Sequence, residues 1–168
     1  MKAVRTPGQV IAFLGGCVLL TGLDQWTKAY VCSRAAGHVP ESGRSAVLIP
    51  HVARMHYIEN NGMAFGLFAG GRIFFLAVFA FMLLAAVYWF LTMPQGKGFR
   101  VTAAGLALFC GGAAGNAIDR VRLGYVVDFI SLIPVSFPVF NLADMMVVSG
   151  CILLAVRLCL FSDDAAAE

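Results

Sequence analysis

Hydrophobic residues dominate four long stretches of the chain, which shorter polar segments separate. The stretches cover about 9–31, 72–93, 100–118 and 139–161. A helix needs about 20 mostly apolar residues to cross a bilayer, at a rise of about 1.5 Å per residue. The second stretch, RIFFLAVFAFMLLAAVYWFLTM, is the most uniformly apolar and is followed by the polar turn PQGKG. The pattern predicts four transmembrane helices.

The segment 32–70 follows a different pattern. It carries prolines, glycines and charged residues, and the short apolar runs within 46–59 are bounded by Pro50 and by Asn60-Asn61-Gly62. Short apolar runs between turn residues are typical of strands. We therefore expect an insert of two or three short strands.

The order of the four predicted helices fixes which connections share a side of the membrane. The insert and the 119–138 loop lie on one side, whereas the 93–99 turn and both termini lie on the other. Asp144, near the start of the fourth helix, falls on the side of the insert. The lysines and arginines do not decide which side is cytoplasmic, although Lys2 and Arg5 precede the first helix.

The N-terminal stretch shares some features with a signal peptide, and Leu14-Gly15-Gly16-Cys17 resembles a lipoprotein processing box. The apolar run before this cysteine is shorter than the roughly 7–15 residues of a signal h-region. Because hydrophobicity continues to Leu23, we expect a retained membrane helix over 9–31. Trp26 and Tyr30 are expected at the membrane interface.

Composition supports a membrane protein and excludes several other classes. Of the 168 residues, 60% are hydrophobic and only 12% are charged, whereas soluble domains have about 25% charged residues. The net charge of +3 comes without a basic cluster, so we expect no nucleic-acid partner. His51 and His56 lack the further ligands that a zinc site needs, and we expect neither metal nor cofactor. The odd number of cysteines and their mostly apolar surroundings favour packing roles.

Acidic residues gather at one depth of the predicted bundle. Four of the nine acids lie near membrane boundaries on the insert side: Asp24, Asp119, Asp128 and Asp144. Ionisable residues at membrane depth are functional candidates because burying them is unfavourable.

The neighbours of these acids separate them into two groups. Asp24 is four residues before Lys28 on a helix, and Asp119 precedes Arg120, so we expect two structural ion pairs. Asp128 and Asp144 have no adjacent cation in the sequence and are the natural pair.

Two facing carboxyl groups share one proton, because both cannot ionise at a dry interface. Such a pair can activate water as a base and protonate a leaving amine as an acid, which is aspartic peptide hydrolysis. It can also bind a proton or a cation in a coupled membrane transporter. The residues alone leave both functions open.

Four motifs, in order along nearly the whole chain, resemble those of the lipoprotein signal peptidases, or signal peptidase II. They are LDQWTKAY (23–30), NNGMAFGLF (60–68), GNAIDRVRLGYVVDFI (115–130) and FPVFNLADMMVVSG (137–150). The resemblance implies an intramembrane aspartic endopeptidase that removes signal peptides from diacylglyceryl-modified prolipoproteins by cleaving before the lipidated cysteine. It also implies inhibition by globomycin and contact with membrane lipids.

The resemblance assigns roles to particular residues. The catalytic pair falls on Asp128 and Asp144. Substrate-binding or structural support falls on Asp24, Lys28, Asn60, Gly62, Asn116, Asp119, Arg120 and Asn141. Without the family, Asn60 and Asn141 fit a turn or a helix cap at least as well.

The expected fold is an all-α membrane protein with four transmembrane helices and a small extracytoplasmic β-sheet insert, and residues 1–168 form a single membrane domain. The resemblance also implies location in the bacterial inner membrane. The termini would then be cytoplasmic and the active site would lie near the extracytoplasmic leaflet.

Overall fold

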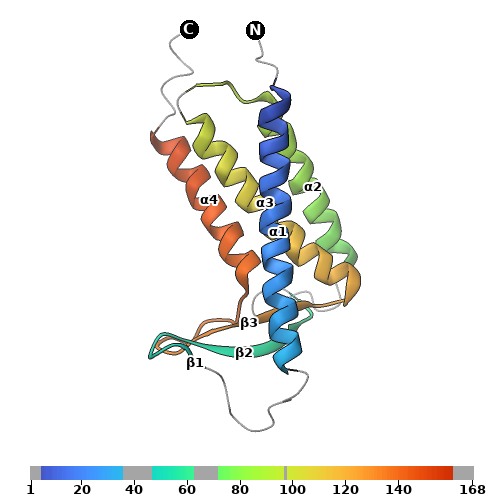
Figure 1. Cartoon of the computed structure of the whole chain (residues 1–168), viewed down its shortest axis with the longest axis vertical. Coiled ribbons are helices and arrows are strands. Elements are labelled where there is room, and N and C mark those ends of the chain that lie inside the picture. Colours follow the sequence, from blue (N-terminus) through green and yellow to red (C-terminus); the bar gives the residue numbers. More distant parts are fainter. Residues whose placement is uncertain (1–4, 36–46, 63–71, 97, 161–168) are drawn as a thin grey trace.

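The computed structural model describes residues 5–35, 47–62, 72–96 and 98–160. The helices are α1 (Pro7–Ala35), α2 (Arg72–Thr92), α3 (Phe99–Arg122) and α4 (Leu142–Leu160), and the strands are β1 (Val47–Ile49), β2 (Ala53–Asn60) and β3 (Val126–Leu132). Within these described ranges, four helices are long and apolar enough to cross a membrane. The helices run side by side and the sheet crosses one end of the bundle (Figure 1).

The opposite end of the bundle holds the start of α1 and the turn between α2 and α3. Arg5 donates from Nε to the Phe90 carbonyl oxygen (2.7 Å) and from Nη2 to the Met93 carbonyl oxygen, at the C-terminal end of α2. The side-chain amides of Gln9 and Gln95 also meet there. This arrangement confirms that the sheet and the α2–α3 turn lie at opposite ends.

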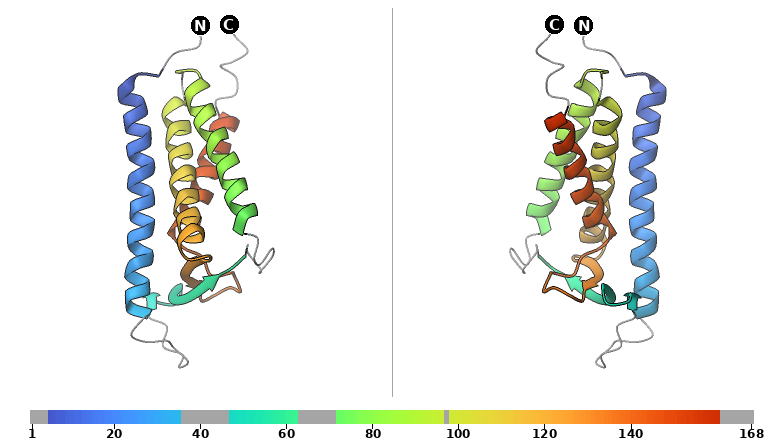
Figure 2. Two further views of the ribbon diagram at one scale, coloured as in Figure 1. Left: turned by 90° about the vertical axis from the view of Figure 1, so that its right-hand side faces the viewer. Right: turned by 90° about the vertical axis from the view of Figure 1, so that its left-hand side faces the viewer.

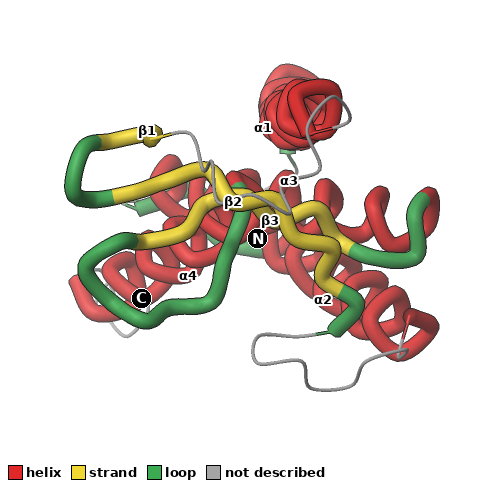
Figure 3. Tube along the Cα trace, turned by 90° about the horizontal axis from the view of Figure 1, so that it is seen from below, coloured by secondary structure: helices red, strands yellow, loops and turns green. Residues whose placement is uncertain are grey.

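The bundle is built around α3, which packs against the other three helices. Glycine permits the closest approaches, because a Cβ on Gly112 would lie 2.4 Å from the Ala143 carbonyl oxygen of α4. On another face of α3, a Cβ on Gly111 would lie 2.7 Å from Leu20 Cβ of α1. Seen from the side and from below, α1 stands apart from α2 (Figures 2 and 3).

Large apolar side chains cover the outward faces of the helices. Ile73 of α2 is 83% exposed, and Leu19 of α1 and Leu160 of α4 are also well exposed. Soluble proteins do not expose such continuous apolar surface. The helices therefore present these faces to lipid.

The sheet is antiparallel, in the order β1-β2-β3. The expectation of a loop over 119–138 is wrong in part, since α3 continues to Arg122 and VVDFISL forms β3. A short apolar run cannot be assigned from periodicity alone, and this one becomes a strand because β2 offers it an edge. The sheet therefore joins the insert to the chain that follows α3.

Pairing beyond β3 brings two distant acids together. The Phe140 carbonyl oxygen accepts from the Phe129 and Ile130 amides at 3.0 and 2.8 Å, and the Phe140 amide donates back to the Ile130 carbonyl oxygen at 3.1 Å. Phe140 precedes Asn141, the residue directly before α4. The bridge consequently places Asp128 of β3 beside the first turn of α4, which carries Asp144.

Candidate active site

Asp128 lies in the middle of β3 and is 2% exposed. Asn60, at the end of β2, donates from Nδ2 to Asp128 Oδ2 at 2.8 Å. The Asn60 Oδ1 atom in turn accepts from the Gly62 amide at 3.0 Å. This turn fixes the orientation of the Asn60 amide, so its nitrogen faces the carboxyl group.

Asp144 lies in the first turn of α4, where Asn141 caps the helix. Asn141 Oδ1 accepts a hydrogen bond from the backbone N–H of Asp144 at 2.9 Å, and Asp144 Oδ2 accepts one from the backbone N–H of Asn141 at 3.1 Å. The two residues form a reciprocal capping box. Asp144 is therefore held by its own helix start, where the helix dipole favours negative charge.

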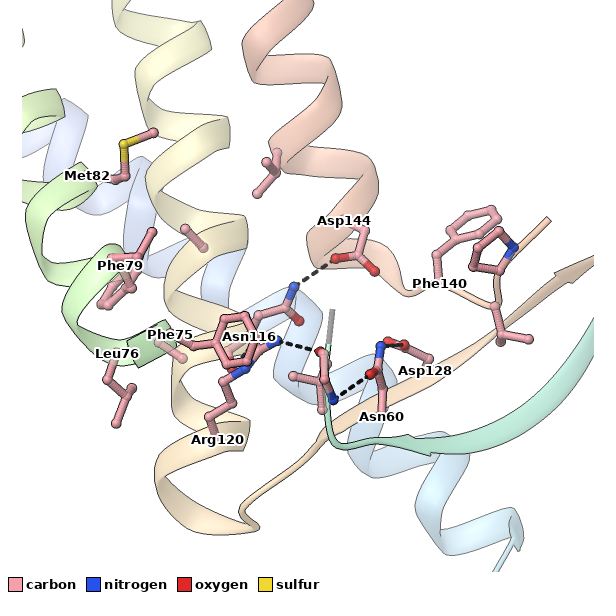
Figure 4. A pocket seen from close by; sticks show the side chains of 18 of the residues that line it. Asn60, Phe75, Leu76, Phe79, Met82, Asn116, Arg120, Asp128, Phe140 and Asp144 are labelled. Atoms are coloured by element: carbon pink, nitrogen blue, oxygen red, sulfur yellow. Dashed lines mark hydrogen bonds between the residues drawn. The ribbon is translucent and has the colours of Figure 1, made fainter. Parts of the chain in front are cut away.

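Asn141 also joins the two acids. Its Nδ2 atom donates to Asp128 Oδ1 at 2.7 Å, while its Oδ1 atom accepts from the backbone N–H of Asp144. From α3, Asn116 Nδ2 donates to Asp144 Oδ1 at 2.8 Å, as seen in the close view (Figure 4). Each carboxyl group thus accepts two N–H hydrogen bonds, and the fully buried Asn141 donates one to each of them.

The pKa of Asp128 is raised to about 6, mainly by burial and also by the nearby charge of Asp144. The hydrogen bonds from Asn60 and Asn141 and the charge of Lys28 act in the opposite direction. Asp128 therefore takes up a proton at a higher pH than an ordinary aspartate.

Both carboxyl groups face a cavity of about 490 Å³. Its opposite wall is apolar and comes from α2, with Phe75, Phe79 and Met82 (Figure 4). The cavity can hold an apolar chain against α2 while a peptide group meets the acids.

A second charged cluster lies behind the two acids, centred on Lys28 of α1. Lys28 Nζ is 2.8 Å from Asp24 Oδ2, 2.9 Å from Asp119 Oδ2 and 2.9 Å from Asn116 Oδ1. Asp24 also accepts from the Ala143 amide at 3.0 Å, which anchors α4 to α1.

These contacts confirm the predicted Asp24–Lys28 pair, whereas the expected Asp119–Arg120 pair is wrong. Consecutive residues on a helix point in different directions, and Asp119 turns toward Lys28. Arg120 instead donates to the Asn116 and Gly62 carbonyl oxygens at 3.3 and 3.4 Å, and its guanidinium lies 4.6 Å from the centre of the Phe75 ring.

The structure brings all ten sequence-predicted site residues into one connected network. The sequence analysis did not identify Gln25, a structural support of the Lys28 cluster, which donates to Asp119 Oδ1 at 2.8 Å and to the Gly115 carbonyl oxygen at 3.1 Å. Its polar side chain beside Asp24 in an apolar helix was the available signal. His51 and His56 take no part, and the described part of the chain contains no group of three or more potential metal ligands.

Comparisons with known proteins agree with this arrangement. A family profile described as signal peptidase (SPase) II matches residues 17–160. A lipoprotein signal peptidase of Caldanaerobacter subterraneus subsp. tengcongensis is 41% identical over 133 residues, covering 79% of this chain and 85% of that protein. Another, from Streptococcus pyogenes serotype M6, is 34% identical over 152 residues, covering 90% and 94%.

Two solved structures, both described as a bacterial membrane enzyme, share the fold. One has a TM-score of 0.79 at 30% identity and covers 100% of this chain and 98% of its own. The other has a TM-score of 0.77 at 31% identity, with coverages of 96% and 99%.

Proposed function

The chain belongs to the signal peptidase II family, and from this premise we propose that Asp128 and Asp144 are its catalytic pair. The protein is a multi-pass membrane aspartic endopeptidase that removes signal peptides from prolipoproteins. The observation that carries the catalytic assignment is that Asn141 links the two carboxyl groups while both line one cavity. The comparisons give no support to the alternative of ion transport.

In the proposed reaction the two acids share one proton and hold a water molecule between them. We assign the proton to Asp128, because burial raises its pKa to about 6. Asp144 takes a proton from water as the hydroxyl oxygen bonds to the scissile carbonyl carbon, and Asp128 gives its proton to the carbonyl oxygen. When the C–N bond breaks, the leaving nitrogen takes the proton of Asp144, and Asp128 takes back a proton from one hydroxyl group of the tetrahedral carbon as the C=O bond re-forms. The cycle needs no covalent intermediate, consumes one water, and returns Asp128 to its protonated form and Asp144 to its ionised form.

The aromatic residues of α1 support a position at the membrane interface. Trp26 and Tyr30 stack with ring centroids 6.3 Å apart, and the Arg34 guanidinium lies 5.3 Å from the Tyr30 ring. Aromatic rings and long cationic side chains concentrate at this boundary. The same turns of α1 carry Asp24 and Lys28, which supports a position of the network near the interface rather than at mid-membrane.

This depth suits a lipid-anchored substrate. We propose that the enzyme resides in the bacterial inner membrane, with the start of α1 facing the cytoplasm and the sheet facing the extracytoplasmic leaflet. The substrate would be a diacylglyceryl-modified prolipoprotein, cleaved before its lipidated cysteine. Its lipid chains would remain among membrane lipids while its signal helix lies against the apolar α2 wall. Globomycin would compete for the same cavity.

The proposed function is tested with purified protein and a prolipoprotein supplied with and without the diacylglyceryl group. Mass measurement should show release of the signal peptide and a product that begins with the lipidated cysteine. Cleavage should persist in EDTA and stop with globomycin. Equal cleavage of the unmodified precursor would contradict the substrate assignment, and loss of activity in EDTA would contradict the metal-free mechanism.

A further inference from the structure

Lys28 makes one more contact than a structural ion pair requires. Its side chain is 3% exposed, and an ammonium group has three N–H donors. Two of these donors contact Asp24 and Asp119, whose two negative charges already exceed the single positive charge of Lys28. The third meets a neutral acceptor, Asn116 Oδ1, at 2.9 Å.

That third contact determines how the Asn116 amide is oriented. An ammonium group can only donate, so it requires the amide oxygen on its side. Asn141 Nδ2 also donates to this oxygen, at 3.0 Å. The amide nitrogen is thereby left facing Asp144 Oδ1 at 2.8 Å. A flipped amide would place its oxygen against the carboxyl group and its nitrogen against the cation, which is unfavourable at both ends.

We propose that Lys28 is a positioning residue of the hydrolytic reaction, acting on Asp144 through the amide of Asn116. The ammonium group holds the amide in its donating orientation and polarises it, which stabilises the negative charge of Asp144 as this group prepares to accept a proton from water. The inference rests on the proposed catalytic role of Asp144. It assigns Lys28 an effect on the reaction beyond holding helices together.

Other charged groups also face Asp144, so the effect of Lys28 must be separated from theirs. Asp128 faces it from β3 and Arg120 from α3, and both interact with it electrostatically. Lys28 of α1 is linked to it by hydrogen bonds through Asn116, with Asp24 and Asp119 at its other donors, and its charge also lowers the pKa of Asp128. Changes at Lys28 leave the first two groups in place.

The single variant Lys28→Met leaves two buried carboxylates without a cation and can fail to fold. Combining it with Asp119→Asn preserves the net charge of the cluster, since one cation and one anion are removed together. The reference is Asp119→Asn alone, which keeps Lys28 on Asn116. A second pair variant, Lys28→Gln with Asp119→Asn, keeps N–H donors at position 28 but removes the charge that polarises Asn116, and it remains available if the methionine variant does not fold.

A matched control is Gln25→Ala. Gln25 lies on the same helix and donates hydrogen bonds to Asp24, Asp119 and the Gly115 carbonyl oxygen, none of which involves Asn116. Its loss should lower the thermal midpoint while leaving kcat and the pH profile unchanged.

The measurement is kcat, KM and the pH profile of kcat on a lipid-modified prolipoprotein in detergent. Relative to Asp119→Asn, the pair variants should lose about 10- to 100-fold in kcat, the range seen for residues that orient reactive groups at metal sites. KM should stay within about twofold, and the acidic limb of the profile should move to higher pH because the nearby cation is gone.

A folded pair variant with the kcat and acidic limb of Asp119→Asn would overturn the proposal and leave Lys28 a structural role. This outcome is distinct from failure of the proposed function, in which Asp144→Asn itself would remain active.

Discussion

Three asparagines set the geometry of the site at the scale of single residues. In each, the side-chain amide oxygen accepts a hydrogen bond. The donor is the backbone N–H of Gly62 for Asn60, Lys28 Nζ for Asn116 and the backbone N–H of Asp144 for Asn141. The amide nitrogens are therefore left to face carboxyl groups. The capping and turn roles suggested by the sequence are confirmed for Asn141 and Asn60, and the same groups also hold the two acids.

Asp128 should make the stability of the protein depend on pH. Its pKa of about 6 in the folded protein exceeds the value of about 3.9 for an unfolded aspartate. The folded state holds the proton more tightly, so this contribution to stability is complete below about pH 4 and is lost as the pH rises through about 6. The difference between the folded and unfolded pKa values corresponds to about 3 kcal/mol in the free energy of unfolding.

Asp128→Asn removes this titration. The thermal midpoint of the wild type, measured in detergent, should fall relative to that of the variant between about pH 4 and pH 7. Parallel curves for the two proteins would show that Asp128 has an ordinary pKa.

At the scale of elements, the position of α4 decides where Asp144 lies. Its start is held by the side chain of Asp24 and by the bridge between Phe140 and Ile130. Farther along, a Cβ on Gly150 would lie 2.6 Å from the Gly105 carbonyl oxygen of α3. The close α3–α4 contact therefore depends on the absence of side chains at these positions.

Gly150→Ala should separate the two helices. The alanine methyl group cannot fit beside a backbone oxygen, so we expect destabilisation by about 1–3 kcal/mol and reduced turnover as Asp144 shifts. Gly22→Ala is the control, because nothing lies within 4 Å of the corresponding Cβ position. Both substitutions bring the same gain in helix propensity. Equal thermal midpoints for the two variants would refute the packing argument.

The sequence predicts some elements well and others poorly, for physical reasons. α2 and α4 follow from their apolar composition alone, because a membrane span must be apolar along its length. α1 and α3 continue past the expected ends at 31 and 118, to Ala35 and Arg122. Hydropathy marks where lipid ends, whereas a helix ends only where its backbone hydrogen bonding stops.

The sequence likewise predicts some features of the candidate site and not others. Absence of a neighbouring cation in the sequence correctly separated Asp128 and Asp144 from the paired acids. The partner of Asp119 could not be found this way, since Lys28 approaches it from another helix. The hydrogen bond from Asn141 to Asp128 could not be predicted from the sequence either, because it depends on the pairing of β3 with Phe140.

At the scale of the whole molecule, the site lies at the sheet end of the bundle, away from the α2–α3 turn (Figure 1). The proposed orientation places this end outside the cytoplasm, where an exported precursor presents its signal peptide. Orientation is the property that the distribution of charge in the sequence did not decide.

Cysteine labelling tests the orientation. In a background without the native cysteines, His56→Cys on the exposed side of β2 should react with an impermeant maleimide in intact spheroplasts. Gly96→Cys, exposed in the α2–α3 turn, should react only after lysis. The reverse pattern would place both acids on the cytoplasmic side and would exclude cleavage after export.

The proposed hydrolysis requires both Asp128 and Asp144. Its most direct test is the cleavage rate of a diacylglyceryl-modified prolipoprotein by the wild type, Asp128→Asn and Asp144→Asn, each first shown to insert and to unfold cooperatively. We expect each variant to be folded and slower by at least roughly 1000-fold, because neither acid can replace the other in its role. Near wild-type turnover by either folded variant would contradict it.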